Sequence, residues 1–275
     1  MPTMDSQRLN GAVSGMTASA RIERILILGG TAEVRRLADA LAARPGLSVM
    51  LSLAGRTAEP LSLPVPVRRG GFGGAEGLAD CLRAERINLL IDATHPYADA
   101  ISANAARAAE LAGVKLLAIR RPPWRRVDGD NWIEVADSAQ AAQALGAAPR
   151  RVFLALGRND LQPFAAAPQH FYLIRSVDPV EPPLAVPHAR YVTARGPFSE
   201  TEDRALLEEH RIEIVVAKNS GGDATHGKIA AARRLGLPVV MLARPALPGV
   251  PSVATVEEAL AWLDHAGTEA VARGV

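Results

Sequence analysis

The chain has 275 residues, 48% of them hydrophobic and 22% charged, which is typical of a well-packed globular protein with one large or two ordinary domains. Its 31 basic and 29 acidic side chains nearly balance, and no basic block is interleaved with aromatic residues, which argues against nucleic acid as a partner. No apolar run approaches the roughly 18 residues that span a bilayer, so no membrane partner is expected. One cysteine excludes an internal disulfide, and the cytoplasm is the expected location.

Strand and helix patterns alternate along the chain, which predicts a parallel α/β fold. Residues 1–23 show neither a basic start nor an apolar core, and we expect a disordered extension there rather than a signal peptide. The first half predicts the strands RILILGG, LSVMLSLAG, PVRRGGF, INLLIDAT and KLLAIRR. Its predicted helices are residues 31–43, GAEGLADCLRAER and the segment after Tyr97.

A segment rich in proline, glycine and aspartate, RPPWRRVDGDN, predicts a linker between two halves. The second half predicts the strands WIEV, RVFLALGR, HFYLIRSV, ARYVTARGPF, IEIVVAKNSGG and PVVMLARP. Its predicted helices are DSAQAAQALG, residues 199–210, THGKIAAARRLG and EEALAWLDHAG. We therefore expect two Rossmann-like lobes with parallel sheets and a cleft between them. The two lobes are expected to span residues 24–124 and 125–275.

The segment IDATHPYA places polar side chains where a buried strand ends. Pro96 forces that ending, because it lacks an N–H and disfavours a helical conformation at His95. In an open parallel sheet, ligands bind at the carboxyl ends of the strands. Thr94, His95 and Tyr97 are therefore candidate site residues.

The first strand turns into a helix through Gly29, Gly30 and Thr31. Two glycines allow close approach of a phosphate, and the helix N-terminus supplies N–H groups and a positive dipole. Arg56 and Thr57 follow the second strand, where an NAD-dependent enzyme would offer an acid to the ribose. An arginine there suits a 2′-phosphate, and these features together favour NADPH as the cofactor.

The second lobe offers a similar strand end that is rich in donors. The strand end carries a lysine, a hydroxyl and two glycines, and a second lysine follows six residues later. These residues are Lys218, Ser220, Gly221, Gly222 and Lys228. Successive amides and ammonium groups suit a carboxylate or a phosphate. Arg158 and Arg195 end two other predicted strands that can face the same cleft. No metal site is expected, because the six histidines show no zinc-site spacing.

GGTAE, DATHPYA, GPF and KNSGG with a following lysine occur in this order, and together they resemble the precorrin-6A reductase family of cobalamin (vitamin B12) biosynthesis. The resemblance runs from about Arg24 to Leu263, and DATHPYA is its specific motif. It implies two Rossmann-like domains with the site between them. It also implies the NADPH-dependent reduction of one carbon–carbon double bond, which converts precorrin-6A into precorrin-6B.

On this resemblance, a hypothesis for the roles of the candidate residues can be stated. Gly29, Gly30, Thr31 and Thr94 would hold the cofactor, with Arg56 and Thr57 at the 2′-phosphate. Tyr97, His95 and Lys218 form the catalytic group, and Tyr97, His95 or a bound water would supply the proton. The carboxylates of the tetrapyrrole substrate would meet Arg158, Arg195, Ser220, Gly221, Gly222 and Lys228. A hand-over of the product to the next enzyme of the pathway is a further expectation.

Three other functions are compatible with parts of this pattern. A cobalt-precorrin-6A reductase would share most of it. A noncatalytic dinucleotide-binding sensor would need GGT and Arg56, but neither DATHPYA nor the lysines of the second lobe. A two-lobed glycosyltransferase would share the architecture alone, since the sequence shows no clear nucleotide-sugar signature.

Overall fold

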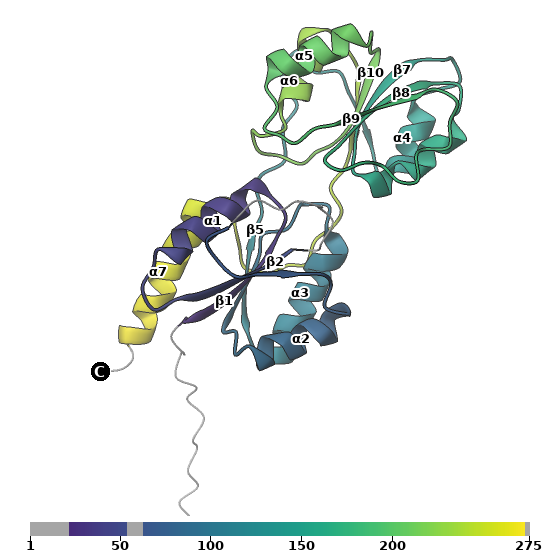
Figure 1. Cartoon of the computed structure of the whole chain (residues 1–275). Helices are drawn as coiled ribbons and strands as arrows, with labels where there is room; N and C mark the ends of the chain where they lie inside the picture. Colours follow the sequence, from purple (N-terminus) through teal and green to yellow (C-terminus); the bar gives the residue numbers. More distant parts are fainter. Residues whose placement is uncertain (1–21, 54–62, 273–275) are drawn as a thin grey trace, which may run out of the picture.

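The computed structural model describes residues 22–53 and 63–272, and it shows two lobes that each contain a six-stranded sheet (Figure 1). Every strand pair in both sheets is parallel. The predicted α/β class with two Rossmann-like lobes is thereby confirmed. Within the described ranges, no helix is long and apolar enough to cross a membrane.

The first sheet has the strand order β12-β5-β4-β1-β2-β3. Its strands are β1 (Arg24–Gly29), β2 (Ser48–Leu53), β3 (Val67–Arg69), β4 (Leu89–Asp92), β5 (Lys115–Ile119) and β12 (Ser252–Val253). Helices α1 (Ala32–Ala42) and α7 (Val256–Ala272) cover one face, and α2 (Gly74–Ala84) and α3 (Asp99–Ala112) cover the other (Figure 1). Because both faces are covered, the central strands are apolar without alternation.

The second sheet has the order β6-β11-β10-β7-β8-β9. Its strands are β6 (Trp132–Val135), β7 (Arg151–Ala155), β8 (Phe171–Ser176), β9 (Ala189–Thr193), β10 (Ile214–Lys218) and β11 (Val239–Leu242). Helix α4 (Ser138–Ala144) packs on one face, and α5 (Glu200–Glu209) and α6 (Gly227–Arg234) pack on the other. Two short 3-10 helices, η1 (Arg158–Asp160) and η2 (Gln162–Ala166), connect β7 to β8.

The C-terminal segment returns to the first lobe, so the expected assignment of residues 125–275 to the second lobe is wrong at its end. Strand β12 pairs with β5, and α7 buries Val256, Ala259 and Leu263 in the core of the first lobe. The helical pattern of this segment was predicted, but an apolar helix face carries no information about which of two similar sheets it will cover. The chain therefore crosses between the lobes twice, once before β6 and once after β11.

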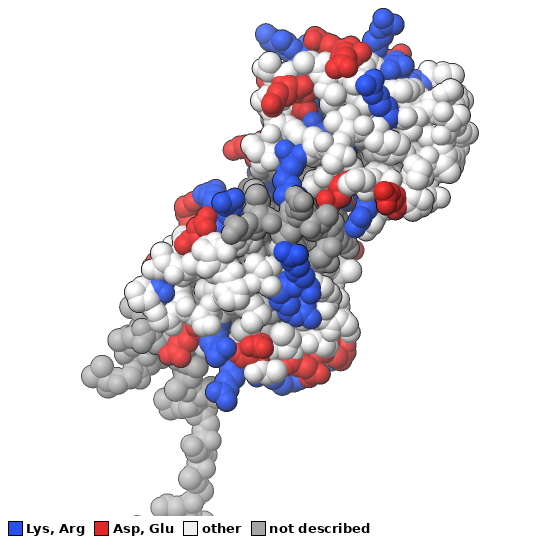
Figure 2. Space-filling model, in the orientation of Figure 1, with Lys and Arg blue, Asp and Glu red and all other residues white. Residues whose placement is uncertain are grey.

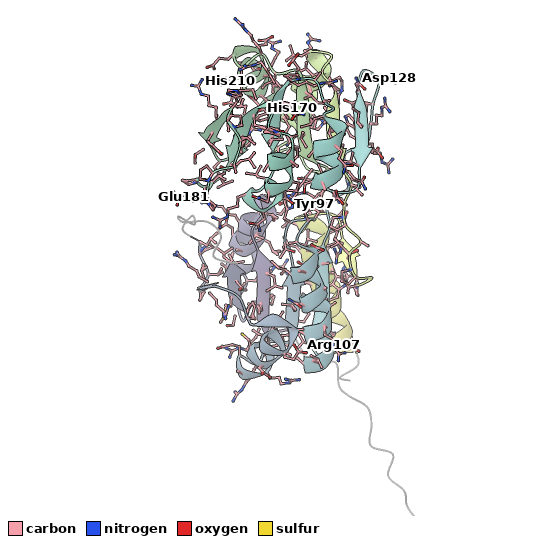
Figure 3. The ribbon with its side chains drawn as sticks, turned by 90° about the vertical axis from the view of Figure 1, so that its right-hand side faces the viewer. Tyr97, Arg107, Asp128, His170, Glu181 and His210 are labelled. Atoms are coloured by element: carbon pink, nitrogen blue, oxygen red, sulfur yellow. The ribbon has the colours of Figure 1, made fainter. Side chains whose placement is uncertain are left out.

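The carboxyl ends of the two sheets meet at the junction of the lobes. The loop after β4 carries His95 and Tyr97, which form hydrogen bonds with Ser220, Asn219 and Leu242 at the ends of β10 and β11. Figure 3 shows Tyr97 at this junction. Since ligands of open parallel sheets bind at carboxyl ends, the two strand ends that face each other here define the candidate site.

Candidate active site

A buried carboxylate shapes the loop after β4. Asp92 is only 4% exposed, and it accepts hydrogen bonds from the Thr94 N–H at 3.1 Å and from the Thr94 hydroxyl at 2.6 Å. The Ser102 hydroxyl of α3 donates to its other oxygen at 2.6 Å. The acid of DATHPYA therefore fixes the conformation of the loop and the orientation of Thr94.

Tyr97 is held on both sides by the backbone of the second lobe. Its hydroxyl donates to the Leu242 carbonyl and accepts from the Asn219 N–H at 2.8 Å, and its ring packs against the core of that lobe. Burial raises the pKa of the phenol to about 12, although the Asn219 N–H opposes this shift. The phenol proton is thus engaged in a bond between the lobes.

His95 forms a second bond across the junction. Its Nδ1 lies 3.3 Å from the Tyr97 N–H, which donates to it, so the ring hydrogen is on Nε2 and points to the Ser220 hydroxyl at 3.2 Å. Burial, together with the cations Arg121, Lys218 and Arg244, lowers the pKa of His95 to about 3. The imidazole is neutral at physiological pH and is not an imidazolium acid.

Two arginines that the sequence reasoning missed complete the junction. Arg121, after β5, donates from Nε to the Ser220 carbonyl and from Nη1 to Glu33 Oε1, both at 2.7 Å. Arg244, after β11, donates to the carbonyls of Asn219 and Ser220 and to those of Arg121 and Pro122. It therefore binds the loop after β10 to both crossings of the chain. In a sequence with this many arginines, only the three-dimensional arrangement distinguishes these two.

The predicted glycines of the second lobe are packed against the first crossing. A Cβ on Gly221, whose φ is +67°, would lie 2.1 Å from the Pro122 carbonyl oxygen, so only glycine fits there. Ser220 is buried, and its hydroxyl is engaged with His95. The structure brings Ser220, Gly221 and Gly222 to the junction, where the hydroxyl and carbonyl of Ser220 bind His95 and Arg121 and the two glycines allow close approach of the first crossing.

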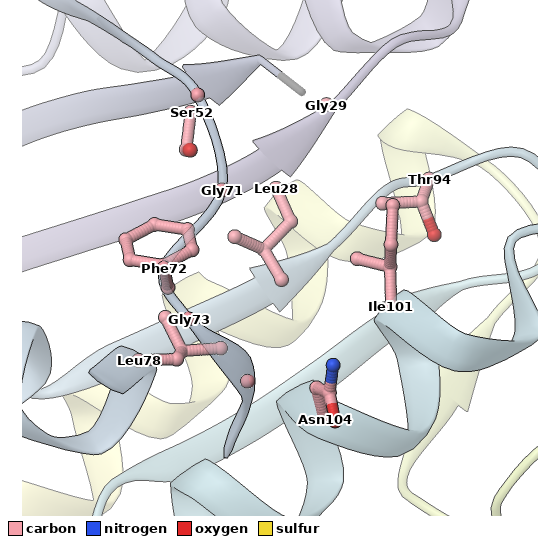
Figure 4. Close-up of a pocket in the computed structure, with 12 residues that line it drawn as sticks. Leu28, Gly29, Ser52, Gly71, Phe72, Gly73, Leu78, Thr94, Ile101 and Asn104 are labelled. Atoms are coloured by element: carbon pink, nitrogen blue, oxygen red, sulfur yellow. The ribbon is translucent and has the colours of Figure 1, made fainter. Parts of the chain in front are cut away.

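A pocket of about 180 Å³ opens at the carboxyl edge of the first sheet (Figure 4). The residues that line it come from the ends of β1, β2 and β4, from the glycine-rich loop after β3 and from α2 and α3, and they include Gly29, Ser52, Phe72, Thr94, Ile101 and Asn104. The loop Gly70–Gly74 was missed, because a run of glycines after a short strand is also typical of an ordinary turn. A smaller pocket lies beyond Thr94 and is lined by Thr31, Glu33 and Arg121.

The turn between β1 and α1 separates these two pockets. Gly29 lines the larger one and Thr31 the smaller one. The Thr31 hydroxyl donates to the Ala93 carbonyl at 3.2 Å and makes no N-cap hydrogen bond to α1. Gly30 has φ +145°, and no atom lies within 4 Å of the position of a Cβ. This geometry leaves room for a phosphate at the helix N-terminus.

The second lobe places cationic side chains at its carboxyl edge. Lys218 Nζ lies 2.6 Å from Asp160 Oδ2 and 4.9 Å from the centre of the Tyr97 ring. Arg158 and Arg195 are exposed after β7 and β9. Figure 2 shows Lys and Arg side chains of both lobes beside the junction of the lobes. This edge suits a ligand with several carboxylates.

Comparison with known proteins shows the family of this chain. The model of the family described as precorrin-6x reductase CbiJ/CobK matches residues 24–264. A precorrin-6A reductase of Sinorhizobium sp is 53% identical over 90% of this chain and 95% of its own length. The chain belongs to the precorrin-6x reductase family. The predicted resemblance is therefore confirmed, and the protein is a reductase.

One solved structure and one distant relative refine this result. The structure of CobK precorrin-6A reductase superimposes with a TM-score of 0.85 at 50% identity, covering 89% of this chain and 97% of that one. A cobalt-precorrin-6A reductase of Priestia megaterium is only 27% identical over 85% of this chain and 95% of its own. This reductase is thus more similar to relatives named for the cobalt-free substrate.

One predicted substrate contact of the reductase is contradicted by burial. Lys228 is only 4% exposed, and its ammonium donates to the Thr225 carbonyl and lies 4.9 Å from the centre of the Trp124 ring. Burial and, to a smaller extent, the charge of Arg175 lower the pKa of Lys228 to about 7, against the opposing effect of Asp203. Lys228 therefore belongs to the core beneath α6 and does not present its ammonium to a substrate.

Other predicted residues of the reductase cannot be placed. Arg56 and Thr57, and the extension 1–23 apart from its last two residues, lie outside the described residues. In the described ranges, no group of three or more histidine, cysteine or acidic side chains is arranged to hold a metal ion.

The burial of Lys228 predicts a pH-dependent stability. The unfolded chain keeps this lysine protonated up to about pH 10, whereas the folded chain releases the proton near pH 7, so folding is favoured as the pH rises between these values. The free energy of unfolding should rise by roughly 3 kcal/mol between pH 7 and pH 9.5, relative to a Lys228→Met variant. Urea titrations of both proteins at each pH measure this, and a difference that does not change with pH would contradict it.

The bonds of Tyr97 predict a structural effect for Tyr97→Phe. The variant removes two hydrogen bonds of the phenol, although the Asn219 N–H still donates to the Leu242 carbonyl at 3.3 Å, and the free energy of unfolding should fall by about 1 kcal/mol. Turnover should stay within tenfold of the wild type, because the phenol proton is engaged at Leu242. Tyr191→Phe, which loses one hydrogen bond inside the second lobe, is the matched control. Unchanged stability with a hundredfold loss of turnover would instead make the phenol a proton donor.

Proposed function

We propose that this reductase uses NADPH to reduce one carbon–carbon double bond of precorrin-6A, giving precorrin-6B in cobalamin biosynthesis. The observation that carries this proposal is the meeting of two carboxyl edges. One has the pockets and helix N-terminus that suit a dinucleotide, and the other has the cations that suit a polycarboxylate. The names of relatives near 50% identity support the same substrate.

The residues of the first lobe fit a dinucleotide. The strand order β3-β2-β1-β4-β5-β12 corresponds to the 3-2-1-4-5-6 order of dinucleotide-binding Rossmann folds, with the switch point between β1 and β4. Gly29, Gly30 and Thr31 would hold the pyrophosphate at this point, with the adenosine half in the pocket of the glycine-rich loop. NADPH supplies a hydride when bound. Arg56 and Thr57 remain the residues proposed for its 2′-phosphate.

Lys218 is the best supported proton donor of the second lobe. Reduction adds a hydride to one carbon of the double bond and a proton to the other. Tyr97 donates its proton to a backbone carbonyl, and His95 donates its ring hydrogen to Ser220. The Lys218 ammonium has three hydrogens and lies against Asp160, which leaves hydrogens to present to the macrocycle. After transfer the amine would regain a proton from solvent. Arg158 and Arg195 would bind the substrate carboxylates.

Two rival functions are less well supported. A cobalt-containing substrate is disfavoured by the low identity to the cobalt-precorrin relative. A noncatalytic sensor would not need the cationic edge of the second lobe. The proposed location is the cytoplasm, where a single cysteine without a disulfide partner in the chain is ordinary. The proposed fate of the product is transfer to the next enzyme of the pathway.

The proposed reaction predicts coupled spectral changes. Purified protein mixed with NADPH and precorrin-6A should lose nicotinamide absorbance in proportion to the formation of a macrocycle reduced by two electrons. Cobalt-precorrin-6A in the same assay should turn over at least tenfold more slowly. Normal NADPH binding with no turnover of either macrocycle would favour the sensor, and faster turnover of the cobalt compound would favour the other branch.

The proposed proton transfer predicts a selective effect of Lys218→Met. Turnover should fall by about a hundredfold or more, because a positioned acid contributes on this scale, while the Kd for NADPH stays unchanged. Lys115→Met, at the start of β5 and far from the carboxyl edge, is the control of the same chemistry. A raised KM with unchanged kcat would show that Lys218 binds a substrate carboxylate and does not donate the proton.

A further inference from the structure

Glu33 has an oxygen that no described residue satisfies. Its Oε1 pairs with Arg121, but its Oε2 is buried without a hydrogen-bond partner. The Glu33 backbone N–H and the Thr31 hydroxyl, which also donates to the Ala93 carbonyl, help to stabilise the carboxylate, but neither forms a hydrogen bond with Oε2. A buried acceptor without a partner is costly, and such groups in native proteins are commonly satisfied by water or a ligand.

The charge of Glu33 is maintained by its surroundings. Burial opposes ionisation, but the Arg121 guanidinium, the Glu33 backbone N–H and the Thr31 hydroxyl together outweigh it, and the pKa of Glu33 lies below its ordinary value. A carboxylate accepts hydrogen bonds and cannot bind a phosphate or a substrate carboxylate. Oε2 therefore calls for a donor such as an amide or a hydroxyl.

The position of Glu33 indicates which part of a dinucleotide would lie there. The two halves of a dinucleotide occupy opposite sides of the switch point, one over each half of the sheet. The larger pocket extends from the ends of β1 and β2 and the loop after β3 to Thr94 and α3, and its β2–β3 side suits the adenosine half. Glu33 lines the smaller pocket together with residues at the ends of β4 and β5, which is the side of the nicotinamide half.

Arg121 adds a donor beside this acceptor. Its Nε donates to the Ser220 carbonyl and its Nη1 to Glu33, so the fork is held between the lobes with Nη2 at its end. An acceptor next to a donor matches a primary amide, which offers an N–H and a carbonyl oxygen. Among the groups of the nicotinamide half, the carboxamide has this pair.

We propose that Glu33 is a specificity-determining residue that accepts a hydrogen bond from the carboxamide amino group of the bound nicotinamide. This inference rests on the proposed use of NADPH by the first lobe. It assigns to the Glu33–Arg121 pair the orientation of the nicotinamide ring toward the second lobe. The pair would thereby connect cofactor binding to the loop that carries Ser220.

The test compares NADPH with its reduced 3-acetylpyridine analogue, in which a methyl ketone replaces the carboxamide and the N–H donors are lost. Kd values are measured by protein fluorescence for the wild type, Glu33→Ala and Asp39→Ala, an exposed acid on the same helix. The wild type and Asp39→Ala should prefer NADPH by at least tenfold, the ratio expected for one hydrogen bond to a charged group. In Glu33→Ala this preference should fall to within about twofold.

Each other outcome has a definite meaning. Equal weakening of both nucleotides by Glu33→Ala would overturn the inference in favour of a ribose hydroxyl as the donor. Equal affinities in the wild type would also overturn it, and this measurement needs no variant that might misfold. Failure of the wild type to bind NADPH at all would instead refute the proposed function, so the two failures are distinguishable.

Discussion

The loop after β10 is bound from both lobes at once, and the geometry of the site depends on this contact. Arg244 donates to carbonyls of this loop and of the first crossing, Arg121 joins the loop to α1, and Tyr97 joins it to the loop after β4. Each bond satisfies a backbone group that is withdrawn from water, and leaving such a group unpaired would be costly. The two carboxyl edges are therefore held opposite each other by backbone hydrogen bonds, and the candidate residues inherit their positions from them.

The two lobes differ in chemistry at their switch points, although their strand orders are similar. In the first lobe the switch point between β1 and β4 is open, with an uncapped helix and a pocket beside it. In the second lobe the corresponding point between β7 and β10 contains the Lys218–Asp160 pair. An open turn suits a dinucleotide, whereas a cation held at the edge suits a carboxylate or the delivery of a proton. The return of β12 and α7 to the first lobe adds a second covalent crossing to this junction.

Much of the fold and the region of the site could be predicted, because both depend on local pattern. Apolar strands, helix periodicity and the polar residues of DATHPYA are contiguous in sequence. The roles of the same residues depend on partners far away, since Tyr97 meets Leu242 and His95 meets Ser220 only after both lobes have folded. Lys228 follows a glycine in a short helix, and its burial beside Trp124 has no sequence signal beyond the apolar residues that follow it. The destination of α7 was undetermined for the same reason.

A crystal structure of the protein with NADPH would test the central claim most directly, namely that the open switch point of the first lobe holds the cofactor and turns the nicotinamide toward the second. The account predicts density for the pyrophosphate at the turn Gly29–Thr31, for the adenosine in the pocket of the glycine-rich loop, and for the nicotinamide on the β4–β5 side facing Lys218. Density for the dinucleotide at the β7–β10 end of the second sheet would contradict the account. Such density would place the cofactor in the second lobe and remove the basis for the roles proposed for Gly29, Thr31 and Lys218.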